Sequence, residues 1–248
     1  DNTLKHGPLE ALITVDEETG MFGAFGLKKE SIQGEILLNL DSEDEGELYI
    51  GCAGGEDVTA TFQYKEVEVE EGDIAVKVTL TGLRGGHSGL EINQGRGNAN
   101  KLMVRFLREA IATYEARLAI LEGGNMRNAI PREAHAIVTI PKENEEELRE
   151  LVEYCENLFN EEFAGIEENI SFKVEKTDLP KGLVPEEIQD DIINSIFACQ
   201  NGVLRNIPSI PDTVETSSNL AIVKVQNGVG VVNILARSAS DSMKEYLT

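Results

Sequence analysis

Three acidic residues follow apolar runs near the N-terminus, where buried strands would end. Glu17 and Glu18 come just after the run at residues 8–15, and Asp41 follows the run at residues 35–40. Neighbouring side chains on a strand point to opposite faces, so the two glutamates would meet different surroundings and could do different work. In an open α/β sheet, ligands gather beyond the carboxyl ends of the strands. Carboxylates that meet there could form part of a site for zinc or another divalent cation. The alternative is that they are solvated acids on loops.

A second group of candidates lies in glycine-rich segments. Two glycines precede His87, and Asn128 follows another glycine pair. Glycine permits positive φ angles and close approach, which predicts that both residues are presented on tight loops. A histidine or an amide placed in this way could polarise a carbonyl or stabilise an oxyanion. The alternative is a pair of ordinary loop residues satisfied by their neighbours.

Arg237 ends the last strand-like run of the chain. Its guanidinium could hold a carboxylate through two parallel hydrogen bonds, or it could simply neutralise an acidic surface. The glycine-rich segments at residues 52–55 and 93–98 do not have the spacing of phosphate-binding loops. The sequence therefore points toward carboxylate and carbonyl recognition rather than phosphate recognition.

The composition excludes several classes of function. The 248 residues include 45 acidic and 22 basic side chains, a net charge of −23, so the surface repels nucleic acid. The charge suits divalent cations, cationic substrates or plain solubility. No apolar run approaches the roughly 18–20 residues of a membrane-spanning helix. Three widely spaced cysteines predict a reducing, cytoplasmic setting, and the missing initial Met predicts a fragment.

The pattern of elements changes along the chain. Residues 8–15 and 35–40 read as strands buried on both faces, as in an α/β domain. From residue 58 the pattern alternates, and it predicts an antiparallel hairpin that turns at residues 70–73. The remaining segments predict an α+β domain with an antiparallel sheet covered by helices on one face. Helices are expected at residues 98–114, 142–165, 185–202 and from 238, and strands at 116–124, 133–141, 169–177 and in a hairpin at 219–238.

Five segments in order resemble the aminoacyl-histidine dipeptidases (peptidase D), in the carnosinase-like branch of the co-catalytic zinc exopeptidases. The resemblance covers essentially the whole chain. The segments are VDEETGMFGAFGL (15–27), NLDSEDEGELYIGCAGG (39–55), LTGLRGGHSGLEINQGRGNANKLMVRFL (80–107), GGNMRNAIPREA (123–134) and VETSSNLAIV with ARSASDS (214–223 and 236–242).

The resemblance implies a catalytic α/β domain with two divalent metal ions, usually zinc, into which an α+β lid domain is inserted. Residues 1–54 would be part of the catalytic domain, and residues 55–248 would be the lid, which also serves dimerisation. Glu17 would be the general base, Glu18 a ligand of one metal and Asp41 a ligand of the other.

The resemblance also implies how the lid meets a small dipeptide substrate, with a C-terminal histidine as the expected preference. His87 and Asn128 would contact the substrate carbonyl or its oxyanion, and Arg237 would hold the substrate carboxylate. The family's His-x-Asp motif and last histidine ligand are not found in this chain. The fragment is therefore expected to be inactive alone.

Two other interpretations remain open. The chain could be a lid-type dimerisation or binding module without chemistry. It could also come from a related zinc aminopeptidase or deacetylase, which shares the adjacent acids at the first strand end. The long segment between residues 134 and 214 favours the dipeptidases, whose lid is enlarged.

Overall fold

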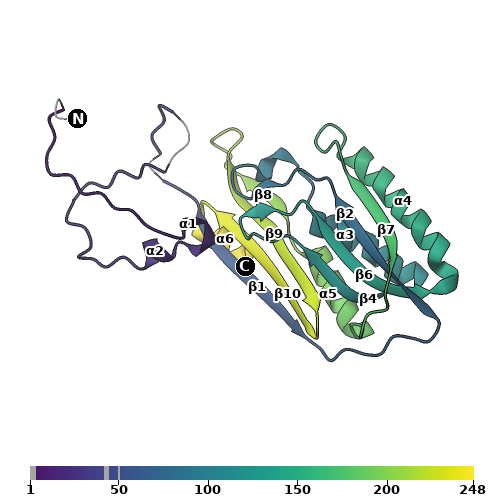
Figure 1. Cartoon of the computed structure of the whole chain (residues 1–248). Coiled ribbons are helices and arrows are strands. Elements are labelled where there is room, and N and C mark those ends of the chain that lie inside the picture. Colours follow the sequence, from purple (N-terminus) through teal and green to yellow (C-terminus); the bar gives the residue numbers. More distant parts are fainter. Residues whose placement is uncertain (1–3, 42–44, 50) are drawn as a thin grey trace. The chain divides into compact units, whose positions relative to one another are not determined.

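The computed structural model describes residues 4–41, 45–49 and 51–248 (Figure 1). The chain forms two compact units, Asp1–Ile50 and Gly51–Thr248, and each is described by itself. The sequence places its domain boundary after residue 54, and this boundary stays a prediction.

The described part of the first unit holds two short helices, α1 (Glu17–Gly20) and α2 (Phe22–Phe25), and no strand. The strands predicted at residues 8–15 and 35–40 are therefore wrong for this structure. Ile13 is 89 % exposed and Leu40 is 88 % exposed. A strand buried on both faces needs neighbouring strands and covering helices, and the described residues of this unit supply neither.

The second unit is built on an eight-stranded antiparallel sheet (Figure 1). The strand order is β1-β10-β9-β4-β6-β2-β7, and β8 pairs with β9 outside this path. The strands are β1 (Gly54–Gln63), β2 (Asp73–Thr81), β4 (Arg117–Gly123), β6 (Ala134–Pro141), β7 (Ser171–Thr177), β8 (Gly202–Asn206), β9 (Val214–Gln226) and β10 (Val229–Ser238). Single turns of 3₁₀-helix lie at Ile92–Gln94 and Lys142–Asn144.

Three long helices pack against one face of this sheet: α3 (Ala99–Tyr114), α4 (Glu145–Glu162) and α5 (Glu186–Ala198) (Figure 1). A short helix, α6 (Asp241–Leu247), follows β10. The core lies between the helices and the sheet. The apolar residues of α3 recur at helical spacing, and the Asn98 side chain caps its start by accepting a hydrogen bond from Lys101 N at 3.2 Å. The predicted α+β fold is confirmed.

The two predicted hairpins have different outcomes. β9 and β10 form the predicted hairpin, with Asn227 and Gly228 both at positive φ (52° and 80°), as a tight primed turn requires. The hairpin predicted around residues 70–73 is wrong, although a turn forms at residues 71–72. β1 pairs with β10, while β2 lies between β6 and β7. A local alternating pattern predicts a strand, but partners far away in the sequence decide its pairing.

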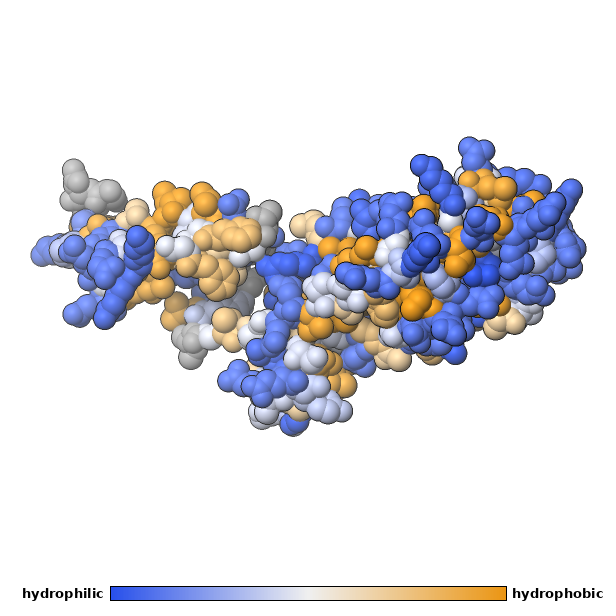
Figure 2. Space-filling model, turned by 90° about the horizontal axis from the view of Figure 1, so that it is seen from below, coloured by the Kyte–Doolittle hydropathy of each residue, from blue (hydrophilic) through white to orange (hydrophobic). Residues whose placement is uncertain are grey.

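The two units differ in how much hydrophobic surface they expose. Figure 2 shows mostly hydrophilic side chains on the second unit with scattered hydrophobic ones, while hydrophobic side chains cover more of the visible surface of the first unit. No helix within the described ranges is long and apolar enough to cross a membrane.

Candidate functional site

A small two-stranded sheet brings the segments of His87 and Asn128 together. β3 (Gly86–His87) pairs with β5 (Ala129–Ile130), and His87 lies opposite Ala129. Next to this pair, the Ser88 N–H donates to the Asn128 carbonyl at 2.8 Å. Two glycine-rich segments that are far apart in the sequence therefore form one local structure.

Arg237, at the end of β10, lies beside His87 across a glycine. A β-carbon added to Gly89 would be 3.2 Å from His87 Cε1 and 3.3 Å from Arg237 Nε. Such contacts are tighter than most real side chains make, so a side chain here would have to push His87 or Arg237 aside by a few tenths of an ångström. The structure therefore groups His87, Asn128 and Arg237, the three residues that the sequence predicts for substrate contact.

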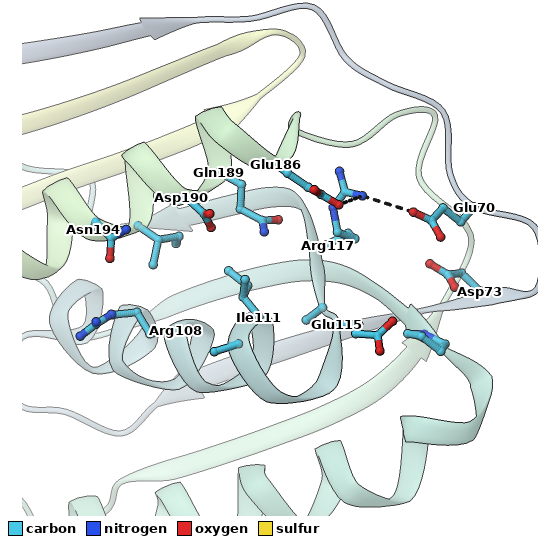
Figure 3. A pocket seen from close by; sticks show the side chains of 14 residues that line it. Glu70, Asp73, Arg108, Ile111, Glu115, Arg117, Glu186, Gln189, Asp190 and Asn194 are labelled. Carbon is cyan, nitrogen blue, oxygen red and sulfur yellow. Dashed lines mark hydrogen bonds and ion pairs between the residues drawn. The ribbon is translucent and has the colours of Figure 1, made fainter.

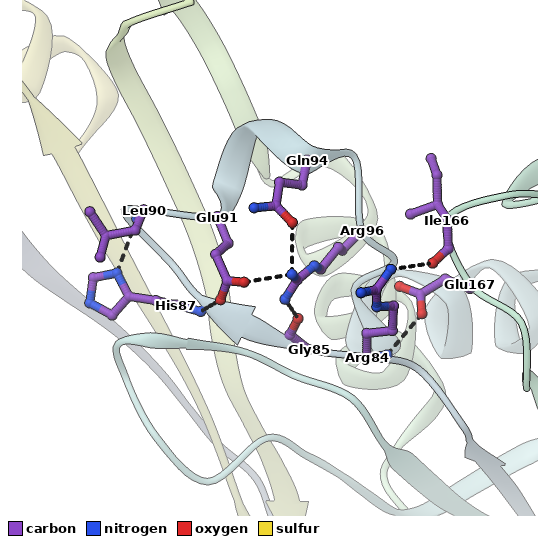
Figure 4. Close-up of polar contacts among 9 residues, drawn as sticks. All are labelled: Arg84, Gly85, His87, Leu90, Glu91, Gln94, Arg96, Ile166 and Glu167. Carbon is purple, nitrogen blue, oxygen red and sulfur yellow. Dashed lines mark hydrogen bonds and ion pairs between the residues drawn. The ribbon is translucent and has the colours of Figure 1, made fainter. Parts of the chain in front are cut away.

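The backbone around His87 fixes which ring nitrogen can donate. The N–H groups of Gly89 and Leu90 donate to His87 Nδ1 at 3.2 and 3.0 Å. Because Nδ1 is an acceptor, the neutral imidazole carries its hydrogen on Nε2. In Figure 4 the ring points away from the neighbouring Glu91–Arg96 pair. The Nε2–H group is thus a donor available to a carbonyl oxygen or an oxyanion.

Glu91 and Arg96 hold the turn that presents His87 (Figure 4). Glu91 Oε2 accepts the His87 N–H at 2.7 Å, and Arg96 Nη2 lies 2.5 Å from Glu91 Oε1. Arg96 also donates to the Gly85 carbonyl. The hydrogen bond from the His87 backbone is the main cause that holds the pKa of the Glu91 carboxyl below its usual value. The hydrogen bond and the charge of Arg96 lower this pKa further. Gly86 has φ +143° and no room for a side chain against Glu91.

Glu167 supports the same loop from a distant part of the chain. It is 3 % exposed, and its carboxylate accepts the N–H of Arg84 at 2.8 Å and the N–H of Gly97 at 2.9 Å. Figure 4 shows it beside Arg84. The sequence gives no signal for Glu167, because its two partners are brought to it only by the fold. Glu91 and Arg96 were also missed, although they lie close to His87 in the sequence.

Arg237 is partly buried, and among the described residues it has no hydrogen-bond or ion-pair partner. Its Nε is buried and unpaired. Burial lowers the pKa of Arg237, and the nearby Arg127 guanidinium lowers it further, while Asp57 opposes both. Arg127 is itself neutralised by Asp57, with 3.1 Å between Nη1 and Oδ2. A guanidinium held in this way is suited to take up an anion.

The acids predicted to bind metal and to act as the general base lie in the first unit. Glu17 and Glu18 form the first turn of α1, and these two residues and Asp41 are exposed. Within the described ranges, no group of three or more His, Cys, Asp or Glu side chains is arranged to hold a metal ion. Carboxylates are suitable ligands, but the described residues do not fit a complete metal site. The roles assigned to these acids stay predictions.

A cavity of about 500 Å³ lies between α3 and α5 (Figure 3). Arg117 Nη1 is 3.0 Å from a Glu186 oxygen and 3.4 Å from a Glu70 oxygen. The charged side chains that line the cavity are Glu70, Asp73, Arg108, Glu115, Arg117, Glu186 and Asp190. None of the predicted substrate residues lines it, so we take the His87 group as the candidate site.

Comparison with known proteins shows what the chain is similar to. Residues 78–167 match the family model of the peptidase dimerisation domain. The chain is 41 % identical over 247 residues to the cytosol non-specific dipeptidase of Escherichia coli (strain K12), covering 100 % of this chain and 51 % of that protein. It is 42 % identical to the crystal structure of aminoacylhistidine dipeptidase from Vibrio alginolyticus, with a TM-score of 0.83, covering 100 % of this chain and 50 % of that one. The chain thus spans about half the length of both relatives, and the predicted resemblance is confirmed.

Proposed function

We propose that this chain, which is similar over its whole length to two dipeptidases, is part of a metal-dependent dipeptidase and carries the residues that hold the substrate. The observation that supports this most directly is the arrangement around Gly89. An Nε2–H donor on His87 and an unpaired guanidinium on Arg237 approach the same glycine. The residues of this unit would bind and orient the peptide.

In this proposal, Arg237 holds the C-terminal carboxylate of the substrate. A guanidinium matches a carboxylate through two parallel hydrogen bonds, and partial burial strengthens the pair. His87 Nε2–H would donate to the carbonyl oxygen of the scissile bond, and the Asn128 amide would be the second donor. Donors fixed in advance at the point where negative charge develops stabilise the transition state.

The carboxylate clamp of Arg237 lies close to the oxyanion donor of His87, and this closeness favours dipeptides. In a dipeptide the scissile carbonyl and the terminal carboxylate are only one residue apart, whereas in a longer peptide cut at its first bond they are farther apart. A carboxylate clamp beside an oxyanion donor would therefore select the shortest substrates. The proposal also includes a preference for a C-terminal histidine. The name of the relative from Vibrio alginolyticus, an aminoacylhistidine dipeptidase, supports this part.

We further propose two divalent metal ions, most simply zinc, with Glu18 and Asp41 among the ligands and Glu17 as the general base. Sites of this ligand type accept several divalent ions. Two carboxylates are too few for a dinuclear site, so the other ligands would come from outside the described residues. Zinc content measured together with activity would test this part separately.

The proposal also includes a homodimer formed through the second unit, and a cytoplasmic location. The first rests on the match of residues 78–167 to a peptidase dimerisation domain. The second follows the name of the relative from Escherichia coli, which places that protein in the cytosol. Sedimentation at several concentrations would test the dimer, and a strict monomer would contradict it.

The decisive experiment replaces Arg237 with Ala in the protein that carries this chain. We expect KM for a dipeptide to rise about tenfold or more, because a charged hydrogen-bonded pair contributes about 1.5–3 kcal/mol. The matched control is Arg132→Ala, which removes an exposed arginine from the segment that holds Asn128. A dipeptide with an amidated C-terminus should show no further loss in Arg237→Ala. Equal losses for acid and amide would refute the carboxylate clamp.

A non-catalytic dimerisation module is the second candidate, and the lack of a complete metal site among the described residues favours it. A zinc aminopeptidase is the third. The same assay separates them, because an aminopeptidase would cut longer peptides as well as dipeptides, and a binding module would cut neither.

A further inference from the structure

Four consecutive residues of β9, at positions 216–219, are polar and buried. Thr216, Ser217, Ser218 and Asn219 are each at most 2 % exposed on β9. Buried polar groups in proteins are nearly always hydrogen-bonded, and a strand interior normally carries apolar residues instead. This segment resembles the dipeptidases, yet the proposed function gives it no role.

Asn219 is the member of this group that reaches the candidate site. Its amide nitrogen donates to the Ala129 carbonyl at 2.7 Å and lies 3.5 Å from the Arg127 carbonyl. These two carbonyls belong to the residues directly before and after Asn128. A single buried side chain therefore holds the backbone on both sides of Asn128.

The orientation of the Asn219 amide follows from these partners. Both neighbours are carbonyl oxygens, so only the NH₂ end can face them. The Oδ1 end is buried and has no partner. An apolar side chain would avoid the cost of this unpaired oxygen, so what the residue contributes is its hold on the two carbonyls.

Asn219 and Arg237 lie on two paired strands of the sheet. Asn219 lies opposite Leu235, and Ser217 lies opposite Arg237, in the β9–β10 pair. Gly124, at φ +71°, has no room for a side chain against the Ala221 carbonyl, so the start of the Asn128 segment lies directly on β9. The same two strands thus set the positions of Asn128 and Arg237.

We propose that Asn219 is a positioning residue that fixes the Asn128 segment relative to His87 and Arg237. It does so by donating to the carbonyls on either side of Asn128. This inference rests on the proposed function, because it takes Asn128 as a donor to the substrate oxygen.

The test is Asn219→Asp, which keeps the shape of the side chain and removes the donor. We expect kcat for dipeptide hydrolysis to fall about tenfold to a hundredfold, because small misplacements of a catalytic group cost this much, with KM changed far less. In an Asn128→Ala background the same substitution should have almost no further effect on kcat. Equal losses of kcat in both backgrounds would overturn the proposal.

The matched control is Asn160→Asp. Asn160 Nδ2 also donates to two backbone carbonyls, those of Glu156 at 2.8 Å and Ile170 at 3.2 Å, but it lies on α4. We expect this variant to keep the wild-type kcat. If Asn219→Asp does not fold, Asn219→Ser carries the same comparison with the same expected results.

A second measurement separates this inference from the proposed function. Amide hydrogen exchange of residues 126–130 should speed up at least about tenfold in Asn219→Asp, with the β2 and β6 amides unchanged. If the whole protein that carries this chain hydrolyses no dipeptide, the proposed function fails, and faster exchange still shows that Asn219 holds this segment. Unchanged exchange would overturn the positioning role, whatever the activity.

Discussion

The two units of this chain both carry strand-length segments rich in apolar residues, but these residues are buried in one unit and exposed in the other. In the second unit, Val76, Val78 and Leu80 of β2 are fully buried between neighbouring strands and the helices above them. In the first unit, the apolar side chains of residues 8–15 and 35–40 are exposed. An apolar run becomes a strand only where other segments offer backbone partners and a second layer, because the hydrogen bonds and the buried area come from them.

The largest effect that we expect from this contrast separates two phenylalanines, one in each unit. Phe106 is fully buried and packs edge to face on Phe172, with 5.0 Å between ring centroids, whereas Phe25 is 81 % exposed. We expect Phe106→Ala to lower the free energy of unfolding by about 3–5 kcal/mol, the usual cost of a large cavity. Phe25→Ala should change it by less than about 0.5 kcal/mol. Urea denaturation of both variants measures this, and a comparable cost for Phe25 would mean that the first unit has a core of its own.

A smaller effect comes from a buried thiol in the second unit. Burial raises the pKa of Cys155 from 9.0 to about 11. The folded state then holds this proton more tightly than the unfolded state, so the stabilisation is full below pH 9 and is lost as the pH rises through 11. Cys155→Ala should remove this decline, which we expect to be on the order of 2–3 kcal/mol.

The exposed Cys52 provides the control for this measurement. Cys52→Ala should show the same stability as the unsubstituted chain from pH 8 to pH 11. If the profile of Cys155→Ala also matched the unsubstituted chain, burial of the thiol would not be the cause of the decline.

The smallest expected effect concerns the carboxylate that shapes the His87 turn. Glu91→Gln should increase amide exchange of residues 86–91 and leave the global unfolding midpoint nearly unchanged. The pKa of Glu91 is lowered in the folded state, so its contribution is present at neutral pH and lost as the pH falls through that pKa. The protection factors of the variant should lack this dependence on pH. Glu68→Gln, at an exposed carboxylate, is the control.

The elements that the sequence predicts correctly are those with local signals. α3 begins at an asparagine cap and keeps helical spacing throughout, and the β9–β10 turn is announced by Asn227 and Gly228. The pairing of β1 with β10 has no such signal, because it joins segments from opposite ends of the second unit. Pairing of this kind depends on the whole fold, and the hairpin predicted from residue 58 failed for that reason.

The same distinction applies to the candidate site. Glycines near His87 and Asn128 mark both residues as presented on tight turns, and the position of Arg237 at a strand end marks it as a candidate clamp. That these three residues meet follows only from the β3–β5 pair and the end of β10. The supporting residues Glu167 and Asn219 act on partners far away in the sequence, so no local pattern could reveal them.

The β3–β5 ladder consists of two residues on each side, while the main sheet has eight strands. So short a ladder resists opening much less than the main sheet does, so the hydrogen bonds of Asn219 and Glu91 are needed to keep the asparagine half and the histidine half in place. A molecule that accepts hydrogen bonds from both halves would act as an extra rung of this ladder. Its binding would then add hydrogen bonds to a ladder that is already formed, and it would hold the two halves together more firmly.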